Sequence, residues 1–245
     1  MSAQLLISTA RAAKRTALDE HAGKSLLAEF GVTVPKSATV GGAAEEDAAF
    51  AKLTPPVVVK IMSPDILHKS DAGGVQVGLK SAAEVKDAIT AMAASPKIKG
   101  ARIDGYLIEE MAPAGQEIVV GGLRDAQFGP LLMVGLGGIF VEVLADVSFR
   151  ICPITRLDAQ EMLDDLKCAA ILAGARGRKA VSREAIIDVL LKVGGENGLL
   201  MRHADDIAEA DINPLIVSEF GAVAVDARFI LTAVKACVSR ERVKG

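Results

Sequence analysis

The fold is decided by residues 57 to 62, which read Val57-Val58-Val59-Lys60-Ile61-Met62. Pro56 and Pro64 bound this run, and its β-branched residues predict a strand that is covered on both faces. Lys60 interrupts the apolar pattern. Because a buried ammonium is costly unless it is paired, Lys60 requires an anionic partner if the strand lies inside the protein. The alternative is an edge strand whose Lys60 reaches out to solvent, and composition does not separate the two interpretations.

The composition is that of an ordinary globular protein. Of 245 residues, 51% are hydrophobic and 24% are charged, with a net charge of -3. This balance excludes a disordered or fibrous chain, and it gives no basic field for a polyanion, so we expect no nucleic-acid partner. The longest uncharged run, residues 128–141, is shorter than the ~18 apolar residues of a membrane span, so we expect no membrane segment.

Cysteine usage and the N-terminus bear on the compartment. Cys152, Cys168 and Cys237 are odd in number and lack metal-type spacing, which favours a reducing cytoplasm over a disulfide framework or a zinc site. Residues 1–18 carry three basic side chains and no acid, as a transit peptide does. They have no apolar core, however, and they continue into a helical pattern, which favours an ordinary helix.

Helical and strand patterns follow one another in mixed order, which predicts an α+β fold. Helices are predicted over residues 11–30, 43–53, 81–94, 156–172 and 182–200, and strands over residues 57–62, 73–79, 106–109, 116–122, 131–136, 211–217 and 222–227. Gly31 ends the first helix, and Ser81 with Glu84 forms a capping box at the start of the third. The chain has neither a Gly-x-Gly-x-x-Gly turn nor a Walker-type loop, so a nucleotide would be bound by another design.

The loop after the lysine-bearing strand contains groups that suit an anion. It reads His68-Lys69-Ser70-Asp71-Ala72-Gly73-Gly74-Val75, and the glycine pair lets backbone N–H groups face a ligand. Phosphate is the obvious candidate. The alternative is a polar turn that carries a surface histidine.

Carboxylates mark the ends of several predicted strands. Glu109 and Glu110 end one strand and Glu117 begins the next, an arrangement that suits metal or ribose hydroxyl binding, or equally a solvated strand end. Near the end of the chain, Asn213 and Asp226 lie on two adjacent strands. Their oxygens suit Mg²⁺, which takes few protein ligands, although a capped hairpin explains the same residues.

Taken together, these motifs resemble the ATP-grasp module of nucleoside-diphosphate-forming acyl-CoA synthetases. That family includes the β subunit of ADP-forming acetyl-CoA synthetase and is related to succinyl-CoA synthetase. The resemblance extends from about residue 18 to residue 230, and it depends on the order and spacing of Lys60, residues 68–75, Glu109-Glu110, Glu117, Arg124-Asp125 with Phe128-Gly129-Pro130, residues 135–142 and Asp211-Ile212-Asn213-Pro214-Leu215.

The resemblance implies an ATP-grasp fold, in which two α+β lobes hold a nucleotide between them. The first lobe is expected over residues 35–106, and the second over residues 1–34 together with 107–245. It also implies ATP or ADP with Mg²⁺ as cofactors. The implied roles are nucleotide phosphates for Lys60, the adenine and hinge segment for Glu109 and Glu110, ribose for Glu117, phosphate approach for Gly137 and Gly138, and Mg²⁺ for Asn213 and Asp226.

The resemblance further implies that His68 relays a phosphoryl group and that Asp211 orients its imidazole. Arg176, in Gly174-Ala175-Arg176-Gly177, matches a segment that supports a phosphate or the partner interface. Nothing in the sequence looks like the CoA-binding and ligase domains that the complete enzyme needs. We therefore expect an ADP-forming acid–CoA ligase subunit that works in a hetero-oligomer with a CoA-binding α subunit carrying the primary phosphohistidine, or else a fragment of a fused enzyme.

Two alternatives to this function remain at the level of the sequence. One is a single-chain carboxylate ligase that forms an acyl-phosphate, and the other is a non-catalytic nucleotide sensor or assembly subunit. Magnesium-dependent phosphorylation of histidine would separate the catalyst from the sensor. The sequence does not name the acid that is activated, because acid selection in this family would belong largely to the partner.

Overall fold

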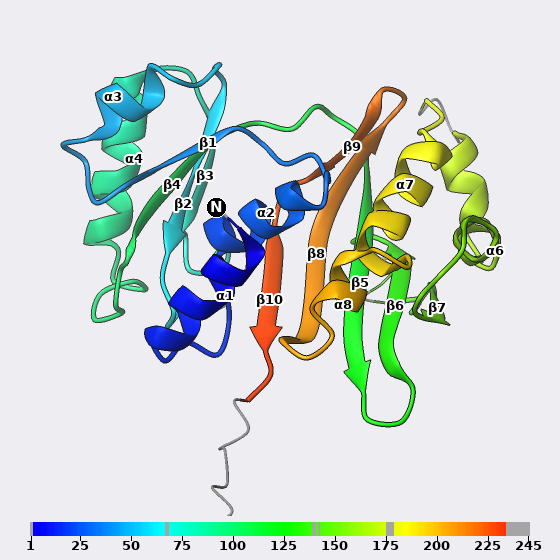
Figure 1. Cartoon of the computed structure of the whole chain (residues 1–245). Coiled ribbons are helices and arrows are strands. Elements are labelled where there is room, and N and C mark those ends of the chain that lie inside the picture. Colours follow the sequence, from blue (N-terminus) through cyan, green and yellow to red (C-terminus); the bar gives the residue numbers. More distant parts are fainter. Residues whose placement is uncertain (1, 67–68, 139–140, 142, 175–178, 234–245) are drawn as a thin grey trace, which may run out of the picture.

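The computed structural model describes residues 2–66, 69–138, 141, 143–174 and 179–233. These residues form two antiparallel sheets with helices packed on them, which confirms the expected α+β, ATP-grasp class (Figure 1). No helix within these ranges combines the length and the apolar character that crossing a membrane requires.

The smaller sheet has four strands in the order β1-β4-β2-β3. Its elements are β1 Ser37–Val40, α3 Glu46–Phe50, β2 Val57–Met62, β3 Val75–Leu79, α4 Ala82–Ala94 and β4 Gly105–Glu110. Because β2 lies between β3 and β4, Lys60 is on an interior strand, and the edge-strand interpretation is wrong. The lobe boundary expected at residue 106 falls inside β4, whose remaining residues pair with β1 and β2 in this sheet.

One face of this sheet is a core and the other faces a cleft. Val57, Val59 and Ile61 pack with α3 and α4, so the alternating side chains of β2 leave Lys60 on the opposite face. The start of α4 is capped as predicted, since the Ser81 hydroxyl accepts from the Glu84 N–H at 3.3 Å. The Glu84 carboxylate, however, accepts from the N–H of Lys80 at 2.7 Å, one residue before the position of a regular capping box.

The larger sheet has six strands, with β10-β8-β5-β6-β7 in order and β9 paired to β8. Their bounds are β5 Gln116–Asp125, β6 Gly129–Leu136, β7 Val147–Ile151, β8 Ile207–Ser218, β9 Gly221–Ala224 and β10 Ala227–Leu231. The turn predicted at Phe220-Gly221 joins β8 to β9. In this sheet β7 and β10 were not predicted, because each is only five residues long and carries an arginine among its apolar residues. In the smaller sheet the four-residue strand β1 was not predicted either.

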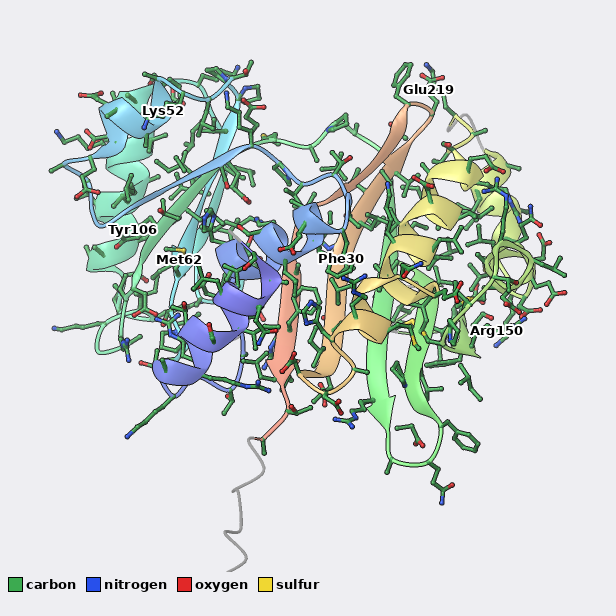
Figure 2. All side chains as sticks on the ribbon, viewed as in Figure 1. Phe30, Lys52, Met62, Tyr106, Arg150 and Glu219 are labelled. Atoms are coloured by element: carbon green, nitrogen blue, oxygen red, sulfur yellow. The ribbon has the colours of Figure 1, made fainter. Side chains whose placement is uncertain are left out.

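Helices cover one face of the larger sheet. They are α1 Ala3–Ala12, α2 Glu20–Glu29, α6 Arg156–Asp164, the 3₁₀ helix η1 Ala169–Ala173, α7 Arg183–Gly194 and α8 Leu199–Arg202. Figure 1 shows α1, α2, α7 and α8 on the same side of the strands. Phe30, labelled in Figure 2, follows α2 and meets the ring of His203 edge-on, with centroids 5.8 Å apart. His203 therefore has a packing role, as do the helices around it.

The helix predicted over residues 11–30 is interrupted between α1 and α2. Lys14 has a φ of 55°, and the chain then runs beside β10, where the Leu18 N–H donates to Phe229 O at 2.9 Å and the Leu231 N–H donates to Thr16 O at 2.7 Å. Asp19 restarts the helix, since its side chain accepts from the Ala22 N–H at 2.8 Å. Pairing with a strand distant in sequence has outweighed the local helical propensity.

Candidate functional site

A cleft of about 1260 Å³ lies between the two sheets. One wall is the face of β2 that carries Val58, Lys60 and Met62, and the other is the helix-free face of β8 with Asp211 and Asn213. β8 alternates strictly there, because Ala210 and Ile212 are buried under the helices. The pleat therefore aims Asp211 and Asn213 into the cleft.

Lys60 has the anionic partners that its position requires. Its Nζ donates to Glu20 Oε1 at 2.5 Å and to Val225 O at 2.9 Å, and it lies 3.0 Å from Glu109 Oε2. That last oxygen is close enough for an ion pair, but it is not aligned for a hydrogen bond. These partners come from α2, β4 and the turn before β10, so Lys60 joins the two sheets through one ammonium.

Two further lysines complete a buried charge cluster. Lys24 Nζ donates to Glu20 Oε1 at 2.7 Å and to Val225 O at 3.2 Å, and it is ion-paired with Glu109. Lys69 pairs with the second oxygen of Glu20. The three lysines face Glu20 and Glu109, and Asp226 is a third anion that acts on the charge of Lys60.

The cluster holds Glu20 and Lys60 in their charged forms. Burial alone would raise the pKa of Glu20, but Lys60, Lys24 and Lys69 outweigh it and lower that pKa to about 2. Burial would likewise lower the pKa of Lys60, whereas Glu20, Glu109 and Asp226 raise it above its ordinary value. Lys60 is therefore a full cation at neutral pH.

Oxygen ligands gather at the β8 side of the same cleft. The Asn213 N–H donates to Asp226 O at 3.2 Å, which sets these two residues beside each other. The pKa of Asp211 is raised by burial and by the charge of Asp226, against the opposing effect of Arg228. Within the described ranges, no three His, Cys, Asp or Glu side chains form a complete metal site. Two carboxylates with one amide fit Mg²⁺, which keeps water and substrate oxygens in its shell.

Glu109 and Glu110, although adjacent in sequence, have different surroundings and different partners. Glu109 is fully buried and its carboxylate is committed to Lys24 and Lys60, while Glu110 accepts from the Thr54 N–H at 2.8 Å. Residues 111–115, which follow β4, also line the cleft. Glu117 also lines the cleft.

Gly137 packs tightly against the start of β5. Its N–H donates to Glu117 O at 2.8 Å, and a Cβ built on it would lie 2.7 Å from the Cβ of Glu117. Gly138 has a φ of +65°, a conformation that favours glycine. Neither glycine is among the described residues that line the cleft, whereas Glu117 is. The need for glycine at 137 therefore has a packing cause.

Two residues singled out in the sequence, His68 and Arg176, lie outside the described residues. On either side of His68, Ile66 and Lys69 both line the cleft. The Gly74 N–H donates to Lys69 O at 2.7 Å, which turns the chain back into β3.

Sequence reasoning missed Glu20 and Lys24. Both are buried, at 6% and 3% exposure. Their only sequence signal is the spacing of four residues within a helix, which is typical of an exposed helix pair. Burial between the sheets, and not the spacing, gives them their place in the site.

Comparison with known proteins places this architecture in a family. The ATP-grasp domain matches residues 9–231. The β subunit of ADP-forming acetate–CoA ligase I of Pyrococcus furiosus is 45% identical over 231 residues, which cover 94% of this chain and 97% of that one. The β subunit of ligase II from the same organism is 42% identical over 92% of this chain and 96% of its own length.

A solved structure agrees with the sequence relatives. The dinucleotide-forming acetyl-coenzyme A synthetase 1 of Ca. Korarchaeum cryptofilum, in complex with coenzyme A and Ca-AMPCP, has a TM-score of 0.88 and 39% identity, covering 94% of this chain and 100% of that chain. The family that the motifs suggested is thereby confirmed. The chain belongs to the ATP-grasp family and, within it, to the β subunits of ADP-forming acyl-CoA synthetases.

Proposed function

We propose that this chain binds a magnesium nucleotide in the cleft between its sheets. The observation that carries the proposal is that cations and oxygen ligands meet in that cleft: Lys60 and Lys69 line it together with Asn213 and Asp226, and the charge of Asp226 acts on Lys60. A polyphosphate that holds Mg²⁺ suits both kinds of group at once, since its oxygens can meet the lysines while its metal meets the carboxylate and the amide. In this proposal the first lobe includes all of β4, because β4 pairs with β1 and β2 in the smaller sheet, and the lobe ends after residue 110 and not at residue 106.

The base and the sugar of the nucleotide have places in the same cleft. Val58, Val77, Met111 and Ile216 line it with apolar surface, and Val77 and Met111 are 59% and 43% exposed. Side chains of this kind suit the two faces of an adenine ring. In this proposal Glu117, which lines the cleft, accepts from ribose hydroxyls. Adenine nucleotides are therefore the favoured ligands.

We further propose that the chain is the β subunit of a cytoplasmic enzyme that converts acid, CoA and ATP to acyl-CoA, ADP and phosphate. In its own step, the bond from the γ-phosphorus to the bridging oxygen breaks and the oxygen leaves with ADP. In the same step a bond forms to a histidine nitrogen, in our proposal that of His68 or of the α subunit. Lys60 neutralises charge on the phosphoryl oxygens, and Mg²⁺, when bound, does the same.

Titration calorimetry with ATP or ADP and Mg²⁺ tests the nucleotide site. Lys60→Met should weaken binding about tenfold to a hundredfold, the cost of about 1.5 to 3 kcal/mol for one charged contact. Asn213→Ala with Asp226→Ala should remove the dependence on Mg²⁺. Lys179→Met changes a lysine that is paired on the surface, and it is the matched control. Unchanged affinity in both site variants would refute the proposed site, and the second variant decides the question if the first does not fold.

A reconstitution assay tests the reaction. The purified chain should make acyl-CoA only after an α subunit from the same cell is added, and labelled ATP should then leave acid-labile label on the chain. His68→Ala should abolish that label. Acyl-CoA synthesis by this chain alone, or no synthesis with any CoA-binding partner, would overturn the assignment.

A further inference from the structure

The Glu20 carboxylate joins two lysines that come from different segments of the chain. Its Oε1 accepts from Lys60, on β2, at 2.5 Å, and its Oε2 pairs with Lys69, in the segment between β2 and β3. Within the described ranges, Glu20 is the only residue that pairs with the Lys69 side chain. One carboxylate therefore fixes the place of Lys69 relative to Lys60.

Glu20 itself stands on a firmly packed element. It is the first residue of α2, and this helix lies so close to β10 that a Cβ built on Gly23 would be 2.8 Å from Ala227 O. Leu26 and Leu27 of the same helix are fully buried. A lysine side chain, in contrast, is a flexible four-carbon stem that loses rotamer freedom when it is ordered. The helix therefore positions the lysines, and not the reverse.

Both lysines keep donors for a ligand. An ammonium has three N–H donors. Lys60 uses two of them, on Glu20 and on Val225 O, and the Glu109 oxygen near it is not aligned for a hydrogen bond. Lys69 uses one, on Glu20. The two lysines line the cleft, whereas the side chain of Glu20 is only 2% exposed, so Glu20 acts on a ligand through them.

We propose that Glu20 is a positioning residue for the nucleotide polyphosphate, because it spaces Lys60 and Lys69 so that both meet phosphate oxygens at once. This inference rests on the proposed function. Side chains that are ordered before the ligand arrives lose less entropy on binding, which raises affinity without a new contact. In the proposed site the lysines meet the phosphates and not the base or the sugar. Glu20 should therefore affect the binding of the polyphosphate and leave the binding of the nucleoside unchanged.

Glu20→Asp separates the position of the carboxylate from its charge. This change keeps the charge but shortens the side chain by one methylene group, so the carboxylate no longer reaches both lysines. Titration calorimetry well below the melting temperature should show the Kd for Mg-ATP raised about tenfold, and the Kd for adenosine changed less than about twofold. Glu184→Asp is the matched control, since Glu184 is also in the first turn of a helix and is ion-paired, but it is 66% exposed. The control should leave both Kd values unchanged.

Lys69→Met is the second variant, and it decides the question if Glu20→Asp does not fold. It should raise the Kd for Mg-ATP by a similar factor and leave the Kd for adenosine unchanged. If the Lys69→Met variant binds Mg-ATP as the wild type does, Glu20 has no second phosphate ligand to place, and the inference is overturned.

The remaining outcomes separate this inference from the proposed function. An unchanged Kd for Mg-ATP in Glu20→Asp, beside a lower melting temperature, would reduce Glu20 to a structural charge and overturn the inference. Equal weakening of Mg-ATP and adenosine would show a general distortion of the cleft and would overturn it too. In both cases the proposed function stands. If the wild-type chain binds no Mg-ATP, the proposed function fails and the inference fails with it.

Discussion

Replacing Glu20 by Gln should destabilise the protein strongly, because this change removes one charge and almost no volume. The Gln side chain fits the same space, but Lys60 and Lys24 then share the single carboxylate of Glu109, and Lys69 loses the carboxylate with which it pairs. Removing one partner from a buried ion pair leaves uncompensated charge in a medium where water cannot solvate it. The exposure of Glu20 is only 6%, so solvent screening does little to reduce the effect.

The pKa of Glu20 gives the magnitude. It falls from 4.5 to about 2 on folding. At about 1.36 kcal/mol per unit, this shift corresponds to about 3 kcal/mol of stability at neutral pH, in line with the ~3 to 5 kcal/mol cost of breaking a buried pair. For a chain of this size, about 3 kcal/mol lowers the melting temperature by roughly 6 to 12 °C.

The sign of the pH dependence follows from the lowered pKa. The stabilisation by the Glu20 carboxylate is complete above about pH 4.5 and is lost as the pH falls toward 2. The difference in melting temperature between the wild type and Glu20→Gln should therefore be largest at pH 7 and shrink by more than half at about pH 3.

Differential scanning calorimetry at the two pH values measures this difference. Glu184→Gln is the control, since it removes the same charge from an ion pair with Arg156 in which both side chains are more than half exposed. Such a pair contributes about 0 to 1 kcal/mol, so the control should melt within about 2 to 4 °C of the wild type at both pH values. A melting temperature for Glu20→Gln equal to that of the control at pH 7, or a loss that does not depend on pH, would refute the reasoning.

Two further outcomes follow from packing. Gly137→Ala should lower the melting temperature by several degrees, because the new methyl group would lie 2.7 Å from the Cβ of Glu117. Gly42→Ala is the control and should leave the melting temperature unchanged, because there is open space around Gly42. Equal effects of the two substitutions in a thermal melt would contradict a steric cause. The Cys152 thiol is buried, and burial raises its pKa to about 11. The Cys152 thiol should therefore resist iodoacetamide at pH 8 in the folded protein and react with it in urea. Rapid alkylation of Cys152 under native conditions, detected by peptide mapping, would contradict this prediction and show that the core around Cys152 opens.

Local pattern was enough for most of the strands near the site. β2 occupies the six residues predicted from its β-branched run and flanking prolines, and the capping serine begins α4 at the predicted position. The strands β5, β6 and β8 were also predicted, although their predicted ends differ from the observed ends by a few residues. Predictions failed where a segment follows a distant partner, as residues 16–18 do along β10.

The charge cluster around Lys60 shows the same limit of prediction from local sequence. The sequence indicated that Lys60 needs an anion if it is buried, since the cost of an unpaired ammonium does not depend on the fold. It did not indicate which anion. Glu20 lies 40 residues away and Glu109 lies on β4, and only the packing of α2 between the sheets brings them to one nitrogen.

The sequence by itself determined the strand that carries Lys60, the strand that carries Asp211 and Asn213, and the family, because each depends on short-range pattern or on the order of motifs. Asp226, predicted on a strand, lies instead between β9 and β10. The tertiary structure decided the rest: that β2 is interior, that Glu20 and Lys24 belong to the site, and that Phe149 faces outward. Alternation along a strand distinguishes its two faces, but it does not say which face the rest of the chain will cover. That choice is made by segments far apart in sequence, which meet only when both sheets and their helices are assembled.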